Sequence, residues 1–74
     1  MGTAVAQQTT LDHKKSRIME IAVEAFGDLG KANQWMYEPN LQLGNRPPIE
    51  QIATTHGFNA VETVLYQIQY AVIG

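Results

Sequence analysis

All three prolines of this 74-residue chain lie in one stretch, at positions 39, 47 and 48. Proline forces the residue before it out of the helical region, so Glu38-Pro39 should end the helix that carries Trp35. Pro47-Pro48 presets the backbone of a following first helical turn, and Gly44-Asn45 can adopt positive φ. The pattern predicts helices on both sides of an ordered Pro/Gly loop. The same stretch carries three large apolar side chains, Trp35, Leu41 and Leu43, which we expect to anchor it to the core.

Hydrophobic periodicity predicts two helices before the loop. Apolar residues recur at i, i+3, i+4 and i+7 over residues 11–26, with Thr9 as the cap and Gly27 as the residue that ends the helix. A second, short helix is expected over residues 28–37. Asp28 is its predicted N-cap, because a carboxylate there accepts from the free amides of the first turn.

Two more helices are predicted after the loop. The first covers residues 48–55, and Gly57 should end it in the left-handed conformation. The second covers residues 59–72, with Asn59 as its cap. The sequence thus predicts an all-α fold, a compact small helical domain of about four helices.

Length and composition predict one small domain. Residues 1–10 are small and polar and are expected to form a flexible tail, which leaves residues 11–74 as the helical domain. With 45% hydrophobic and 16% charged residues, the chain is too apolar to be disordered. A chain this short buries only ~60% of its unfolded surface. We therefore expect the chain to bury part of its apolar surface, either in a homo-oligomer such as a homodimer or against a different partner.

Several classes of function are excluded by absent signals. The chain has no cysteine, no apolar run of ~20 residues and no signal-peptide pattern, so we expect a cytoplasmic protein with no membrane partner. His13 is expected in solvent, and His56 at a helix C-terminus, where the dipole favours a cation. No histidine or carboxylate stands at ligand spacing from His56. The sequence predicts no enzyme, no catalytic residue, no cofactor and no metal.

One alternative is a small homodimeric regulator that binds DNA. Residues 52–59 resemble the first helix and turn of a helix-turn-helix. The helix that would read the bases, residues 59–73, contains no Lys or Arg, and the chain carries a net charge of -2. Phosphate contacts need cations, so direct DNA binding by this chain alone is disfavoured.

The predicted last helix has two apolar sides. Its inward stripe comprises Val61, Val64, Leu65, Ile68 and Val72. Tyr66, Tyr70 and Ile73 lie on nearly the opposite side, at ~100° per residue. Such side chains are typical interface anchors. We predict a partner-binding surface formed by Tyr66, Tyr70, Ile73, the chain end at Gly74, and Arg46 in the loop. This stripe can serve a different protein or a homodimer.

An ordered set of motifs resembles a known family. The first set is Ala32, Trp35, Met36, Pro39, Asn40, Leu43, Gly44, Pro48, Glu50 and Ile52; the second is His56-Gly57, Val61, Leu65, Ile68 and Tyr70. Together they resemble the Xre/MbcA/ParS-like toxin-binding domain of bacterial antitoxins, from about Ile18 to Val72. Asn45 and Ala71 depart from the pattern, because the family often has glycine at both positions.

This resemblance implies a function as part of a type II toxin-antitoxin system. The implied partner is a toxin of the RES-domain or a related NAD-consuming kind. The antitoxin's C-terminal part would inhibit it sterically, by covering the toxin's NAD pocket. Full-length relatives usually carry an N-terminal helix-turn-helix domain. The resemblance leaves open whether this chain is a stand-alone variant, or whether its DNA-binding domain is missing or supplied by another chain. A homodimeric structural module without a toxin is a further hypothesis.

Overall fold

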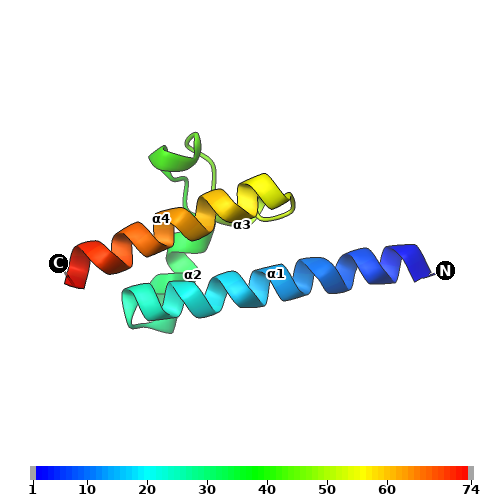
Figure 1. Cartoon of the computed structure of the whole chain (residues 1–74), viewed down its shortest axis with the longest axis horizontal. Helices are drawn as coiled ribbons and strands as arrows, with labels where there is room; N and C mark the ends of the chain where they lie inside the picture. The colour runs from blue at the N-terminus through cyan, green and yellow to red at the C-terminus, as the bar shows by residue number, and fades with distance from the viewer. Residues whose placement is uncertain (1, 74) are drawn as a thin grey trace.

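The computed structural model describes the backbone of residues 2–73 and the side chains of residues 11–71. The described elements are α1 (Gly2–Phe26), α2 (Leu29–Tyr37), the 3₁₀ turn η1 (Leu41–Leu43), α3 (Pro48–Gln51) and α4 (Thr55–Ile73). The two long helices, α1 and α4, lie side by side and run in the same direction, so their C-terminal ends are at the same end of the molecule (Figure 1). The predicted all-α fold of four helices is confirmed, with no strand among residues 2–73.

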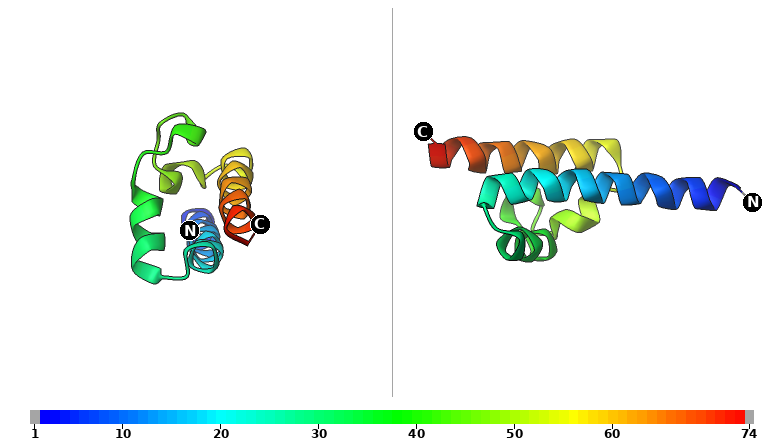
Figure 2. Two further views of the ribbon diagram at one scale, coloured as in Figure 1. Left: turned by 90° about the vertical axis from the view of Figure 1, so that its left-hand side faces the viewer. Right: turned by 90° about the horizontal axis from the view of Figure 1, so that it is seen from below.

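The core lies where α1 meets α2 and α4. Figure 2 shows α2 and α4 on different sides of α1, so α1 has two helical neighbours. This arrangement explains the wide apolar stripe of α1. The residues of α1 that are buried in the core are Ile18, Ile21 and Ala22. The other buried hydrophobic residues of the core are Ala32, Met36, Leu43, Ile52, Val61, Val64 and Leu65.

The boundary between α1 and α2 agrees with the prediction. Gly27 has φ of +70°, and its amide donates to the Val23 carbonyl at 2.7 Å. Asp28 is the N-cap of α2, because its carboxylate accepts from the Lys31 amide at 2.8 Å. At the other end of α2, Glu38 is extended with ψ of 145°, as expected for a residue before proline.

The start of α1 differs from the prediction. The helix begins at Gly2 and not at Leu11, so Thr9 does not cap it. Residues 3–10 contain no proline and no further glycine, and Ala and Gln favour helix, so nothing stops the helix before Leu11. The side chains of residues 1–10 lie outside the described residues, and the flexibility expected of this tail stays a prediction.

The turn between α3 and α4 also corrects the prediction. α3 is a single turn, Pro48–Gln51, and α4 begins at Thr55. Thr54 is the capping side chain, since its Oγ1 accepts from the Gly57 amide at 3.0 Å. Gly57 therefore lies in the first turn of α4 and does not end α3 in the left-handed conformation. A Cβ at this position would meet the Gln51 carbonyl oxygen at 1.8 Å, so close backbone approach is what requires glycine here.

The earlier start of α4 changes the roles of two more residues. His56 is exposed in the first turn of α4, and not at a helix C-terminus as predicted. Asn59 lies inside the helix, where its carbonyl accepts from Thr63 Oγ1 at 2.9 Å, so it is not a cap. Both corrections follow from the cap at Thr54, which adds a turn to α4.

Trp35 is half-buried, against the expectation of a buried anchor. Its ring packs on Phe26, with the ring centroids 5.8 Å apart and the planes at 48°. We expect a moderately blue-shifted fluorescence that shifts to the red in one transition with denaturant. Trp35→Ala should lower the free energy of unfolding by about 2 kcal/mol, below the ~3–5 kcal/mol of a fully buried aromatic. A solvent-like emission from the native protein would contradict this packing.

Candidate partner-binding surface

The outward side of α4 carries a pair of stacked tyrosines. The ring centroids of Tyr66 and Tyr70 are 6.3 Å apart, with 24° between the ring planes. Tyr66 is half-buried, whereas Tyr70 has an exposed fraction of 66%. The domain thus partly covers Tyr66 and leaves Tyr70 mostly in solvent. The pair lies near the C-terminal ends of α1 and α4. The side chain of Ile73, and Gly74 entirely, lie outside the described residues.

The inward side of α4 is already covered. Val61, Val64 and Leu65 are buried, and Ile68 is half-buried against the core. The domain core therefore uses the stripe that was predicted for it, apart from Val72, whose side chain lies outside the described residues. Tyr70 contributes little to the packing of the core, so its ring is available for contact with another molecule.

The loop before α3 is organised by Asn40. Its Oδ1 accepts from the Gln42 amide at 2.9 Å, and its carbonyl accepts from the amides of Leu43 and Asn45 at 3.0 and 2.8 Å. Gly44 and Asn45 have φ of +71° and +62°, as predicted. Asn tolerates this left-handed region better than most residues with a side chain. An ordered turn therefore forms at Asn45, where the family often has glycine.

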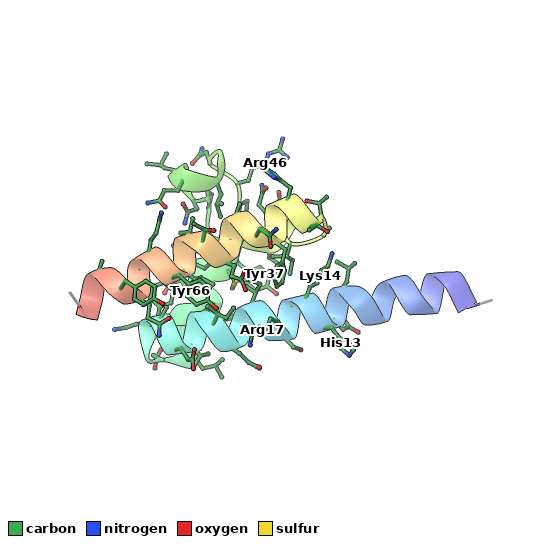
Figure 3. All side chains as sticks on the ribbon, viewed as in Figure 1. His13, Lys14, Arg17, Tyr37, Arg46 and Tyr66 are labelled. Atoms are coloured by element: carbon green, nitrogen blue, oxygen red, sulfur yellow. The ribbon has the colours of Figure 1, made fainter. Side chains whose placement is uncertain are left out.

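Arg46 closes this loop through its backbone. Its carbonyl accepts from the Asn40 amide at 3.1 Å, which forms an isolated antiparallel bridge. The Arg46 side chain is exposed and points away from the helices (Figure 3). The loop thus holds the backbone of Arg46 in place and leaves its guanidinium in solvent. Arg46 and the tyrosine pair come from different elements, so the predicted site residues divide into two separate groups.

The two leucines of η1 have opposite environments, which corrects one expectation. Leu43 is buried in the core, but Leu41 has an exposed fraction of 87% and does not anchor the loop. A 3₁₀ turn has three residues per turn, so residues two apart point in different directions. The periodicity of so short a segment cannot tell which of the two leucines faces the core.

Sequence reasoning missed a groove between α1 and α4. The groove is open to solvent and has a volume of about 690 Å³. Tyr66 is the residue of α4 that lines it. Its other lining residues all come from α1: Ser16, Arg17, Met19, Glu20, Ile21, Val23 and Glu24. Figure 3 shows Arg17 and Tyr66 on the two neighbouring helices. The sequence signal for it is that Met19 and Val23 carry the apolar side of α1 next to the charged side chains of Arg17, Glu20 and Glu24.

Two of the lysines support the fold. Lys14 Nζ donates to the Ala53 carbonyl at 3.2 Å, and so links α1 to the turn before α4. Lys15 Nζ lies 5.9 Å from the centre of the Tyr37 ring, on α2. Among the residues that the structure describes, no cluster of three or more His, Cys, Asp or Glu could hold a metal ion. No helix in the described part has the length and apolar character needed to cross a bilayer.

Comparison with known proteins decides the family. The family model for the antitoxin Xre/MbcA/ParS C-terminal toxin-binding domain matches residues 22–71. The chain belongs to this antitoxin family. The match confirms the predicted resemblance, and the toxin-binding domain that it describes contains the Asn40 loop, Arg46 and both tyrosines of α4.

One curated relative of this antitoxin domain is antitoxin Xre of Pseudomonas putida. The two sequences are 31% identical over 55 residues, which cover 74% of this chain and 35% of the relative. The antitoxin domain thus spans about a third of the relative's length. No solved structure matches the chain.

Proposed function

We propose that this antitoxin domain binds a RES-type, NAD-consuming toxin in the cytoplasm and inhibits it by covering its active site. The family supports a toxin as the partner, and the resemblance to RES-partnered antitoxins supports the kind of toxin. In this proposal the protein acts by binding and carries out no catalysis.

The stacked tyrosines are the observation that carries this proposal. A phenol ring that is two-thirds exposed contributes little to the fold but offers a large, rigid contact area. Stacking on Tyr66 restricts the rotamers of Tyr70 before binding, which lowers the entropy lost on association. Both residues lie within the matched toxin-binding region, residues 22–71. These properties favour Tyr70 as an anchor of the toxin interface.

Arg46 is proposed as a second contact. Its backbone is fixed by the bridge to Asn40, and its guanidinium is exposed. A planar cation of this kind pairs with a carboxylate of the partner in a bidentate geometry, or with a phosphate. Arg46 would therefore add orientation and charge specificity to the apolar contact made by the tyrosines.

The alternative of a DNA-binding regulator gains no support from the geometry. The observed α4 is longer than predicted, but residues 55–73 still contain no Lys or Arg. Without cations this helix lacks the contacts that hold a recognition helix on the phosphate backbone. A gel-shift assay at low salt tests the alternative directly, and no shift is expected.

Tyr70→Ala should weaken toxin binding by ~1–4 kcal/mol, the range of a truncated interface anchor. The free energy of unfolding should change by less than about 0.5 kcal/mol, because the side chain is mostly exposed. The measurement pairs titration calorimetry, against a catalytically inactive RES-type toxin, with thermal unfolding. Ile73→Ser extends the same test to the end of the stripe.

Tyr37→Ala is the matched control, since Tyr37 is a half-exposed tyrosine on α2. It should leave toxin affinity unchanged. If Tyr70→Ala unfolds the protein while affinity per folded molecule is unchanged, Tyr70 belongs to the core. If Tyr70→Ala abolishes dimerisation but toxin binding survives, the tyrosines serve a homodimer, and Arg46 becomes the better candidate for the toxin contact.

A further inference from the structure

The loop between α2 and α3 presents the side chain of Leu41 to solvent on an ordered backbone. Asn40, the residue before it, forms hydrogen bonds with the backbone of Gln42, Leu43, Asn45 and Arg46. A single exposed leucine is ordinary on a protein surface. The difference here is that these hydrogen bonds order the loop before a partner arrives, so less entropy is lost when Leu41 is bound.

The core of the domain does not use Leu41. Its side chain has an exposed fraction of 87%, whereas Leu43, two residues further on, is the residue of η1 that is buried in the core. Removal of the Leu41 side chain therefore opens no cavity in the fold. An apolar side chain that is held in place, and that the fold does not need, is well suited to contact another molecule.

Arg46 places a positive charge beside this apolar side chain. The isolated bridge pairs Asn40 with Arg46, so the turn that starts at Leu41 begins next to Arg46 in space. Arg46 is the one charged residue in positions 39–49 of the sequence. The preceding carboxylate, that of Glu38, accepts a hydrogen bond from the Gln34 amide at 2.8 Å. The loop is thus locally cationic, and a complementary surface offers an apolar pocket with a carboxylate at its rim.

The position of the loop favours the toxin as the partner. Figures 1 and 2 show η1 and its loop projecting from the side of the molecule opposite to α1. η1 packs against α4, the helix that also carries Tyr66 and Tyr70, so the loop is continuous with the proposed toxin contact. The whole loop lies within the matched toxin-binding region, residues 22–71.

We propose that Leu41 and Arg46 together select the toxin: Leu41 enters an apolar pocket of the toxin surface, and Arg46 pairs with an Asp or Glu at the rim of that pocket. This inference rests on the proposed function, and it adds a requirement on the toxin surface that the tyrosines do not supply. A toxin without the pocket leaves Leu41 in solvent, and a toxin with a cation at the rim repels Arg46. Either difference lowers the affinity for that toxin.

Leu41→Ser should weaken binding of the full chain to a catalytically inactive RES-type toxin at least about tenfold, with an unchanged midpoint of thermal unfolding. Leu41→Met keeps an apolar side chain of similar size and should retain most of the affinity. Arg46→Ala should also weaken binding. The affinity of this variant should depend less on salt concentration than that of the unchanged chain, because one charge pair is lost. Titration calorimetry at two salt concentrations measures these effects.

Leu29→Ser is the matched control, since Leu29 is an exposed leucine at the start of α2. It should bind the toxin like the unchanged chain. If the unchanged chain does not bind the toxin, the proposed function and this inference both fail. If the unchanged chain binds and Tyr70→Ala weakens binding, but Leu41→Ser binds normally, this inference alone is overturned. Equal losses in Leu29→Ser and Leu41→Ser, or loss of a toxin-free dimer in Leu41→Ser, would overturn it as well.

Discussion

Gly57→Ala should lower the free energy of unfolding by about 3 kcal/mol or more. The added Cβ would meet the Gln51 carbonyl oxygen at 1.8 Å and the carbonyl carbon at 2.8 Å. These atoms belong to the backbone at the end of α3, so no side-chain rotation relieves the clash. The start of α4 must move away from α3, which breaks the cap made by Thr54. For a domain of this size, such a loss is a large share of the total stability.

Gly44→Ala is the matched control for this prediction. Gly44 has φ of +71°, and a Cβ there would have no atom within 4 Å. The substitution therefore adds left-handed backbone strain without a clash, at a cost of about 1 kcal/mol. Chemical denaturation of both variants, followed by circular dichroism, distinguishes the cost of the steric clash at position 57 from the cost of left-handed backbone strain at position 44. Equal midpoints for Gly57→Ala and the unchanged chain would show that α3 and α4 are not held as close as the structure places them.

Ile18→Ala is expected to cost ~2–5 kcal/mol, the range for emptying a fully buried aliphatic site. Ile18 has an exposed fraction of 0% and is one of the largest fully buried side chains. It precedes the matched region, residues 22–71, yet it contributes to the core of that region. A chain that begins at Ala22 would lose both Ile18 and Ile21, and we expect it to remain unfolded. A chain that begins at Leu11 keeps both and should fold.

Ser16→Ala on the same helix is the comparison for Ile18→Ala. Ser16 is exposed, and Ala has the higher helix propensity, so this change should leave stability equal or slightly higher. Urea denaturation gives the free energies for both variants. A cooperative transition with an unchanged midpoint in the chain that begins at Ala22 would show that the first turns of α1 are dispensable for the core.

Features decided by neighbouring residues were predictable from the sequence. Gly27 and Asp28 mark a helix boundary because their capping bonds reach only three or four residues along the chain. The positive φ at Gly44-Asn45 and the helix start at Pro48 follow from the same kind of local chemistry. The spacing of the motif residues was sufficient to predict the family, and the periodicity of the helices to predict the all-α class.

Only the tertiary structure decided how these segments pack. The sequence alone determined that Gly57 and Leu41 lie near turns, but not what surrounds them. Gly57 is required because α4 approaches the Gln51 carbonyl, and Leu41 is exposed because η1 turns Leu43, and not Leu41, into the core. The groove between α1 and α4 likewise depends on which helices become neighbours. Hydrophobic periodicity shows which side of a helix is apolar, but not which element covers that side.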